Sequence, residues 1–196
     1  MIWTQLAAWL GAHGLELAGA VTAVLGIWLT TKRLLLCWPV TLVSDLLYLV
    51  VFYQARLYSD ALLQIFFLAF TLYGWWHWWR GVLDEGEVRI VPLPLASMLA
   101  AIAAGAAGSF LLGALAVRMG AALPHLDAAL ASYSLVASWW GARKHLANWW
   151  LWIGIDLVYI GEYIYKGLQL TALLYAGLVV LAVLGLRDWR RAASAA

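Results

Sequence analysis

One pattern of Trp, Asp, Tyr and Gly residues occurs twice in the chain at a constant offset of 111 residues, and the two copies align without a gap. Self-similarity at a fixed spacing indicates an internal duplication. The chain is therefore expected to fold as two like halves. The residues that recur unchanged include Trp28, Trp38, Asp45, Tyr48, Leu57, Ala61, Leu62, Leu63, Gly74 and Trp78, matched by Trp139, Trp149, Asp156, Tyr159, Leu168, Ala172, Leu173, Leu174, Gly185 and Trp189.

The composition places both halves in a membrane. Hydrophobic residues make up 66% of the 196 residues and charged residues only 11%, and the mean hydropathy is +0.87. This leaves too little polar surface for a water-soluble globule, so lipid is the expected solvent. The net charge of +2 gives no surface for nucleic acid, and the single cysteine, Cys37, cannot form a disulfide within the chain. Membrane proteins built from two like halves place a solute site between them.

Seven segments have about the length that crosses a bilayer. The first three form one repeat and the last three form the other, and the fourth is left over as a linker. Three crossings end on the opposite side of the membrane, so a second unit in the same orientation needs one extra crossing. We therefore predict an all-α protein with two parallel three-helix repeats around a linker helix. The expected spans are Leu15–Thr31, Leu34–Tyr53, Tyr58–Trp79, Leu93–Val117, Leu126–Gly141, Leu146–Tyr165 and Leu168–Arg187.

These spans define the expected organisation of one membrane domain, residues 1–196. Repeat one covers 14–80, the linker helix covers 93–117, and repeat two covers 125–190. Loops on the cytoplasmic side are enriched in Lys and Arg. Nine such residues fall on one side of the predicted topology and three (Arg56, Arg118 and Lys166) on the other. The distribution predicts an N-terminus outside the cell and a C-terminus inside it.

Two carboxylates at membrane depth are the first candidates for function. Asp45 and Asp156 each follow a repeat-related Trp (Trp38, Trp149) by seven residues. Each also precedes a Tyr (Tyr48, Tyr159) by three. Ionisable groups inside a bilayer cost about 2.5–3.5 kcal/mol on insertion scales, so they normally face a cavity or a partner. Two interpretations stay open: the pair contacts substrate, or it locks the fold through hydrogen bonds to neighbouring groups.

Helical spacing places further candidates on shared faces. Trp149, Trp152, Asp156 and Tyr163 lie along one face of the sixth span, with Asn148 at its mouth. Two Trp residues one turn apart offer a stacking surface for a flat ligand. The predicted substrate-binding set is completed by Asp60, Gln64 and Phe67 of the third span and Tyr175 of the seventh.

Structural interpretations exist for several of these residues. Asp60 lies near the start of its helix, where a carboxylate favours the positive dipole end, so it is either a cap or a ligand. Glu16 and Asp127 are expected to open their helices in the same way. The Trp cluster at the end of the third span, Trp75, Trp76, Trp78 and Trp79, is expected to form a belt at the membrane interface.

Several of these motifs, taken together, resemble the PnuC family of bacterial vitamin transporters. They are the Asn-Trp-x-x-Trp of Asn148–Trp152, the downstream Asp156, the Thr171-Ala172-x-x-Tyr175 run and the Gly185-x-x-x-Trp189 ending. Leu57-Tyr58-x-Asp60-x-x-x-Gln64 and Tyr73-Gly74-Trp75-Trp76 also match. The similarity extends from about Glu16 to Trp189. The chain departs from the family at Ala147, where many members have Glu, which bears on the fine choice of substrate.

The resemblance implies a seven-helix transporter of SWEET-like architecture in the bacterial inner membrane, often assembled as a homotrimer. It implies uptake of nicotinamide riboside by facilitated diffusion, with a cytosolic kinase that phosphorylates and traps the substrate for NAD biosynthesis. The tryptophan pair of the family's substrate motif matches Trp149 and Trp152. No catalytic residue, metal site or cofactor is expected, and no P-loop is present in the sequence.

Alternative functions remain open at this stage. Thiamine is also an aromatic cation and suits the same residues, and riboflavin and deoxynucleosides are carried by relatives. A proton-coupled carrier is a further alternative, because intramembrane carboxylates often relay protons. An intramembrane aspartyl protease would also carry two buried Asp residues, but Asp156 follows only Gly154-Ile155 and lacks the Gly-x-Gly-Asp signature. The chain is therefore not expected to be an enzyme.

Overall fold

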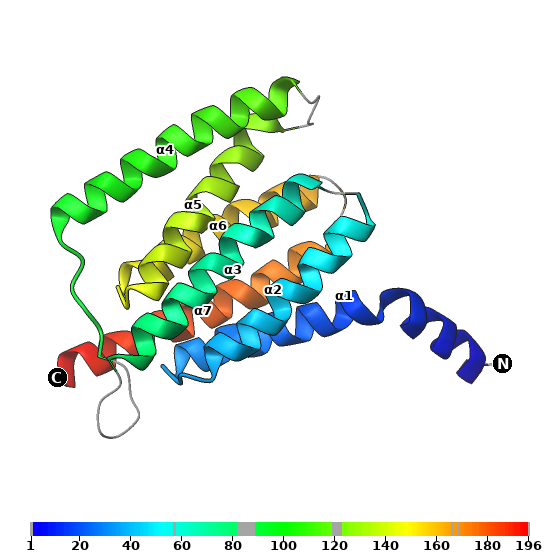
Figure 1. Cartoon of the computed structure of the whole chain (residues 1–196), viewed down its shortest axis with the longest axis horizontal. Coiled ribbons are helices and arrows are strands. Elements are labelled where there is room, and N and C mark those ends of the chain that lie inside the picture. Colours follow the sequence, from blue (N-terminus) through cyan, green and yellow to red (C-terminus); the bar gives the residue numbers. More distant parts are fainter. Residues whose placement is uncertain are drawn as a thin grey trace.

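The structure is a computed structural model that describes residues 2–56, 58–81, 89–118, 123–165, 167 and 169–195. Within these ranges it is all-helical, with no strand, and Figure 1 shows the helices in chain order. The helices are α1 (Ile2–Thr31), α2 (Cys37–Gln54), α3 (Tyr58–Trp79), α4 (Leu95–Arg118), α5 (Pro124–Ala142), α6 (Ala147–Tyr165) and α7 (Gln169–Ala195).

The terminal helices are longer than their apolar segments predict. We expected the first helix to begin at Leu15, but α1 begins at Ile2. The preceding residues are mostly good helix formers, and an isolated glycine such as Gly11 weakens a helix by about 1 kcal/mol without ending it. Glu16 therefore lies inside α1, so its prediction as an opening residue is wrong, whereas Asp127 does lie in the first turn of α5. At the other end, α7 continues past Arg187 to Ala195.

Hydropathy alone finds fewer spans than we predicted. Among the described residues, four helical segments are long and apolar enough to cross a membrane: Gly14–Thr31, Cys37–Gln54, Leu95–Arg118 and Thr171–Ser194. The remaining helices, α3, α5 and α6, are rich in Trp, Tyr and Ser, and α6 carries Asp156 and Glu162. These polar groups lower the hydropathy of a helix, and they also make it suited to a position between other helices.

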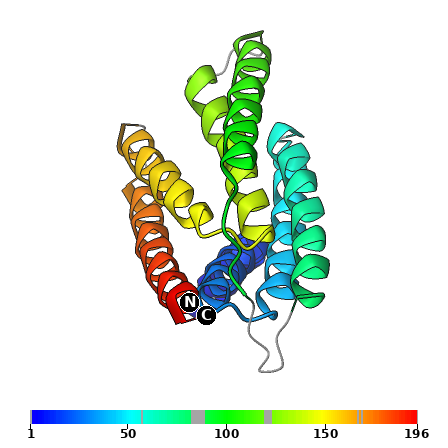
Figure 2. The same ribbon diagram turned by 90° about the vertical axis from the view of Figure 1, so that its left-hand side faces the viewer.

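The helices contact one another in a closed cycle. Starting from α1, each packs on the next in the order α2, α3, α5, α6, α7 and back to α1. The extra helix, α4, packs on α5 and lies outside the cycle, as Figures 1 and 2 show. We call the end of this bundle at which α1, α3, α5 and α7 terminate the basic end. In Figure 2 the paired helices α2–α3 and α6–α7 lie on opposite sides of the bundle and spread apart toward the other end.

Backbone geometry repeats at the offset found in the sequence. Arg33 and Lys144, 111 residues apart, have φ angles of 58° and 66° in the turns before α2 and α6. Arg56 and Gly167, again 111 apart, have φ angles of 60° and 74° in the turns after those helices. Non-glycine residues seldom adopt a positive φ. Equivalent turns of the two halves therefore each place a residue with a positive φ at the same repeat position.

A Trp–Gly–Trp packing unit also occurs in both halves. In the first half, the Trp38 ring lies against the backbone of Gly74 and meets Trp78 edge to face, with centroids 5.2 Å apart. In the second half, Trp149 lies against Gly185 and meets Trp189 at 5.6 Å in the same geometry. Because glycine has no side chain, the indole can pack directly on the helix backbone.

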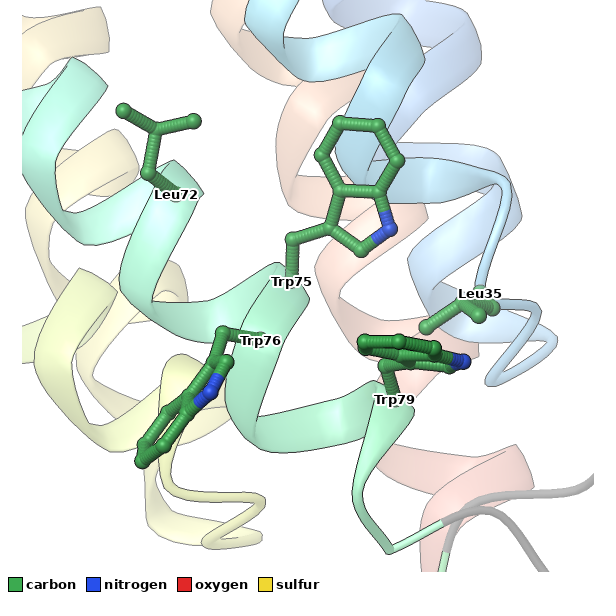
Figure 3. A pocket seen from close by; sticks show the side chains of 5 residues that line it. All are labelled: Leu35, Leu72, Trp75, Trp76 and Trp79. Carbon is green, nitrogen blue, oxygen red and sulfur yellow. The ribbon is translucent and has the colours of Figure 1, made fainter.

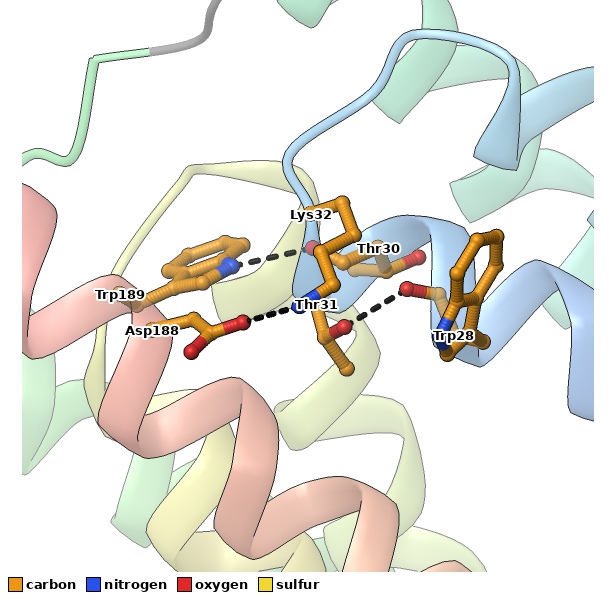
Figure 4. A network of polar contacts seen from close by, with 6 residues as sticks. All are labelled: Trp28, Thr30, Thr31, Lys32, Asp188 and Trp189. Atoms are coloured by element: carbon orange, nitrogen blue, oxygen red, sulfur yellow. Dashed lines mark hydrogen bonds and ion pairs between the residues drawn. The ribbon is translucent and has the colours of Figure 1, made fainter.

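The two halves exchange equivalent hydrogen bonds at the basic end. Trp78 Nε1 donates to the carbonyl oxygen of Gly141 at 3.2 Å, and Trp189 Nε1 donates to that of Thr30 at 3.0 Å. Donors and acceptors both differ by 111 residues, so the exchange is reciprocal. Figure 4 shows the second contact together with the ion pair between Lys32 and Asp188, 2.7 Å long. The Thr30 carbonyl also accepts from the Arg33 N–H and the Gly141 carbonyl from the Lys144 N–H, so each indole is a second donor to a carbonyl at a helix end.

The main hydrophobic core joins the two halves at this same end. Its buried members come from α1, α2, α3, α5, α6 and α7: Leu29, Cys37, Trp38, Trp78, Ala142, Trp149, Ala182, Leu186 and Trp189. A smaller cluster of Leu130, Ala137 and Ile155 packs α5 on α6. The large side chains therefore close the bundle at the basic end.

Candidate functional site

The Asn-Trp pair that opens α6 lies in the closed end of the bundle. Asn148 is buried, and its Nδ2 donates to the carbonyl oxygen of His145 at 2.7 Å. Trp149 is also buried, with its ring against Gly185, and its indole nitrogen has no hydrogen-bond partner. Trp38, its counterpart in the first half, has an unpartnered indole nitrogen too. The structure thus gives Trp149 an extensive packing role.

Trp152 lies one turn further along α6 and is half-buried. It packs against both hydrophobic clusters, the main core at the basic end and the smaller cluster between α5 and α6. Its position is therefore the boundary between the closed end and the rest of the bundle. Asp156 follows one turn later and is buried.

The two repeat-related carboxylates have different surroundings. Asp45 Oδ2 accepts a hydrogen bond of 2.7 Å from the Thr71 hydroxyl on α3. The residue equivalent to Thr71 in the second half is Ala182, which has no donor. Among the residues that the structure describes, no side chain donates a hydrogen bond to Asp156. The two aspartates have the same sequence context, but only Asp45 accepts a side-chain hydrogen bond from a described residue.

Three tyrosines from α6 and α7 form an aromatic cluster beyond Asp156, toward the end opposite the basic end. The ring centroids of Tyr159 and Tyr163 are 5.7 Å apart, and Tyr175 lies 4.8 Å from the first and 5.1 Å from the second. In the first half the corresponding residues are Tyr48, Phe52 and Gln64. The first two of these are stacked at 5.6 Å.

The third helix carries the other predicted ligands. Asp60 is exposed in the first turn of α3, which agrees with a capping position. Gln64 and Phe67 are half-buried, and the Gln64 side-chain oxygen is enclosed without a hydrogen-bond partner. Thr71, on the same stripe, is the residue bonded to Asp45. Because the amide oxygen of Gln64 has no hydrogen-bond partner, it can accept a hydrogen bond from a hydroxyl group of a ligand.

Two hollows open on the outside of the bundle, and neither is lined by the predicted binding residues. A hollow of about 480 Å³ near the end of α3 is lined by Leu35, Leu72, Trp75, Trp76 and Trp79 (Figure 3). A larger one of about 740 Å³ lies among α3, α4 and α5, with mainly apolar walls that include Phe66, Phe70 and Trp139. Within the described part of the chain, no group of three or more His, Cys, Asp or Glu residues is arranged to hold a metal ion.

The Trp cluster at the end of α3 divides into exposed and buried members, and the prediction of an interfacial belt is wrong for Trp78. Trp79 is 68% exposed and Trp76 is 46% exposed, whereas Trp78 is fully buried. Its N–H bond to Gly141 places it between the halves. The helical spacing explains the difference, because Trp78 follows Gly74 by one turn and shares its inward face.

Sequence reasoning also missed Lys144, in the turn before α6. Its side chain is buried, and its ammonium lies against Gly81 just after the end of α3. Burial lowers the pKa of Lys144 below the ordinary lysine value, because the surroundings disfavour the charged form. A cation near the last carbonyls of a helix interacts favourably with its dipole, which gives Lys144 a structural role. The signal available in the sequence was its pairing with Arg33 at the repeat offset.

The chain matches the model of a known family over almost its whole length. The match is to the nicotinamide mononucleotide transporter family and covers residues 13–191. The chain belongs to this family. Relatives named PnuC also match the chain, so the resemblance found from the motifs is confirmed.

Individual relatives agree with this assignment. The chain is 28% identical to the nicotinamide riboside transporter PnuC of Escherichia coli (strain K12), over 92% of this chain and 88% of the relative. It is 30% identical to the riboflavin/roseoflavin transporter RibM of Streptomyces davaonensis, over 96% of this chain and 85% of the relative. A crystal structure of the vitamin B3 transporter PnuC has the same fold, with a TM-score of 0.74 and 22% identity, covering 98% of this chain and 87% of that one. The chain is thus a multi-pass membrane transporter of a vitamin-transporting family, and not an enzyme.

Proposed function

We propose that this protein takes up nicotinamide riboside across the bacterial inner membrane by facilitated diffusion. Seven helices span the bilayer as two parallel three-helix repeats around the linker α4, with the N-terminus outside and the C-terminus in the cytoplasm. The basic end is then the cytoplasmic end. A cytosolic kinase phosphorylates the nucleoside and traps it, and the transporter assembles as a homotrimer.

The observation that supports transport most directly is the uneven contact between the two halves. At the basic end they share a hydrophobic core, reciprocal Trp hydrogen bonds and an ion pair. Figure 2 shows the paired helices spreading apart toward the other end. Gln64 lies in the first half of α3, Tyr175 in the first half of α7, and Asp156, Tyr159 and Tyr163 from the middle of α6 onward, so these residues lie away from the basic end. A bundle closed at one end and loosely joined at the other is one state of an alternating-access cycle. If the contacts at the basic end open and equivalent contacts form at the other end, the solute passes from one side of the membrane to the other.

The proposed binding site combines a stacking surface with polar acceptors. Trp152 lies at the bottom of the proposed site, at the boundary with the hydrophobic core of the basic end. A pyridinium ring can stack on it, with a cation–π contribution of about 0.5–2 kcal/mol. The unpartnered Gln64 oxygen and Asp156 supply acceptors for ribose hydroxyls and for the positive charge. Tyr163 and Tyr175 close the side of the site, and Asn148, Trp149 and Phe67 support it from neighbouring positions.

A titration of the detergent-purified protein against nicotinamide riboside, thiamine, riboflavin and deoxyguanosine tests the substrate. We expect the tightest binding with nicotinamide riboside, and a best affinity for riboflavin would contradict the proposal. Uptake into proteoliposomes is expected to be independent of a pH gradient. Strong dependence on the gradient would favour the proton-coupled carrier instead.

A pair of neighbouring Trp variants tests the stacking surface. Trp152→Ala is expected to weaken nicotinamide riboside binding by about tenfold, the loss of roughly one good aromatic contact. Trp150→Ala is the matched control, because Trp150 is 54% exposed and lies on another face of the same helix. Equal affinities for the two variants would show that Trp152 does not contact the substrate.

A further inference from the structure

The two contacts between the halves, α1 with α7 and α5 with α3, differ in charge at the basic end. Lys32, just after α1, pairs with Asp188 of α7 at 2.7 Å (Figure 4). The residues at the repeat offset are Arg143, just after α5, and His77 of α3, so no carboxylate stands opposite the cation there. Three basic residues lie close enough to His77 to interact with it electrostatically: Arg143, Lys144 and His145. Among the described residues, no carboxylate lies within ion-pair distance of Arg143.

Arg143 is exposed, and two aromatic side chains hold its guanidinium in place. The guanidinium carbon lies 5.4 Å from the centroid of the Trp139 ring, and Nη1 donates to the Tyr73 hydroxyl at 3.4 Å. Tyr73 in turn stacks on Trp139, with ring centroids 5.0 Å apart. A guanidinium carries five N–H donors, so most of them are available to an acceptor from outside the chain. Phosphate oxygens suit this geometry because they accept from a guanidinium in pairs.

The hollow among α3, α4 and α5 begins beside this cation. Trp139 lines the hollow and lies against the Arg143 guanidinium, and Phe70 of the same lining packs on Trp139 at 6.1 Å. Along α4 the lining extends from Ser97 to Leu112, about 22 Å at 1.5 Å per residue. One leaflet of the hydrocarbon core is about 15 Å deep, so the hollow extends over the depth of a leaflet. Its volume of about 740 Å³ lies within the range of about 300–1,000 Å³ that ligand pockets have.

The walls of this hollow suit an acyl chain. Leu62, Phe66 and Leu111 line it and are exposed, so it opens on the lipid around the protein. The Ser132 hydroxyl in its wall already donates to the carbonyl oxygen of Gly105 at 2.8 Å. An apolar hollow inside a bilayer with a cation at its end matches a molecule that has an apolar chain and an anionic head.

We infer that one anionic phospholipid binds where α3 packs on α5, with its phosphate on Arg143 and an acyl chain in the hollow among α3, α4 and α5. The lipid supplies the negative charge that Asp188 supplies at the equivalent contact, and it joins the two halves. Arg80, just after α3, lies over the Trp76 ring at 4.4 Å and adds a second cation at the basic end. Basic groups between membrane helices are known to bind anionic lipid headgroups. This lipid site lies apart from the proposed solute site.

Native mass spectrometry of the detergent-purified protein tests the headgroup contact. Phosphatidylglycerol and phosphatidylcholine with the same acyl chains are titrated separately, so that the chains are equal and the net charge differs. We expect the wild type to bind one phosphatidylglycerol per chain more tightly than phosphatidylcholine, and Arg143→Gln should weaken phosphatidylglycerol binding about fivefold. Arg190→Gln is the matched control and should leave it unchanged, because Arg190 lies over Trp150 at the same 5.4 Å and Trp150 lines neither hollow.

A second pair of variants tests the acyl chain. Ala104 lines the hollow, and Ala106 is exposed on the opposite face of α4. Ala104→Phe should fill the hollow and weaken phosphatidylglycerol binding at least as much as Arg143→Gln does. Ala106→Phe adds the same ring outside the hollow and should leave the binding unchanged. Thermal unfolding and gel filtration check that each variant is folded and report its oligomeric state.

The outcomes decide between this lipid and other occupants. If Arg143→Gln and Arg190→Gln weaken phosphatidylglycerol binding equally, only the overall charge acts and the site is wrong. If glycerol phosphate, which has no acyl chain, binds the wild type as tightly as phosphatidylglycerol, Arg143 holds a free phosphate compound instead. If Ala104→Phe changes the oligomeric state and leaves lipid binding intact, the hollow is an interface between copies of the chain and the inference is overturned. The titrations contain no transported solute, so they do not depend on nicotinamide riboside being the substrate.

Discussion

The contact between Trp149 and Gly185 gives a sharp test of how α6 packs on α7. A methyl group placed on Gly185 would lie 2.6 Å from ring carbons of Trp149, much closer than a normal carbon–carbon contact. Trp149 is only 2% exposed, so its ring has no free space into which it can move. We therefore expect Gly185→Ala to destabilise the protein.

The magnitude follows from two opposing effects. Overpacking a close contact costs about 1–3 kcal/mol, and the buried, rigid indole places this site at the upper end. Replacing a helical glycine by alanine contributes about 1 kcal/mol in the opposite direction. The net loss is about 1–2 kcal/mol, which corresponds to a fall in Tm of roughly 2–8 °C for a chain of this size. Gly177→Ala, in the same helix, isolates the second effect, because a methyl group there has no neighbour within 4 Å.

Thermal unfolding of the purified protein can be followed with a thiol-reactive dye, because the single cysteine, Cys37, is 1% exposed and belongs to the same core. Gly177→Ala should leave the Tm unchanged or raise it, and Gly185→Ala should lower it. Trp149→Phe in the Gly185→Ala background should recover part of the loss, since the smaller ring relieves the clash. Equal Tm values for the two glycine variants would refute the packing argument.

The remaining predictions concern the basic end. Trp189→Phe keeps an aromatic ring but removes the hydrogen bond to Thr30, so it should lower the free energy of unfolding by about 0.5–1.5 kcal/mol, or the Tm by roughly 1–6 °C. The control, Trp79→Phe, changes an exposed ring and should have no effect. Equal shifts in Tm for the two variants would contradict a stabilising role for the Trp189 hydrogen bond. Burial lowers the pKa of Lys144, so the folded state binds fewer protons than the unfolded state as the pH approaches the ordinary lysine value of 10.5. The stability of the wild type relative to Lys144→Met should therefore rise as the pH increases toward 10.5. Parallel Tm–pH curves for wild type and variant would show that Lys144 makes no contribution.

The repeat and the membrane class were predictable from the sequence because they depend on composition and spacing. Identical residues at a constant offset indicate a duplication whatever the surrounding structure, and the positive φ pairs Arg33/Lys144 and Arg56/Gly167 agree with it. The helix from Tyr58 to Trp79 was predicted with the observed bounds. The length of an apolar segment did not predict where a terminal helix ends, because α1 and α7 continue as helices beyond their apolar segments.

The identity of the candidate residues was likewise predictable, but their roles were not. Trp149 and Trp152 look alike in the sequence, yet one is enclosed against Gly185 and the other stands at the edge of the core. Trp78 matched a membrane-interface pattern and is instead a buried hydrogen-bond donor. A periodic pattern shows which residues share a helix face, but it does not show which neighbouring helix covers that face.

The sequence by itself determined that this is a lipid-solvated chain of two like halves with aromatic and carboxylate residues at equivalent positions. Only the tertiary structure decided that the equivalent aspartates are not equivalent in their surroundings, since the difference lies in Thr71 and Ala182 on other helices. It also decided which end of the bundle is closed, through carbonyls of Thr30 and Gly141 that meet indole groups from the opposite half. Hydrogen bonds and packing between distant segments depend on the helix arrangement, which local sequence does not encode.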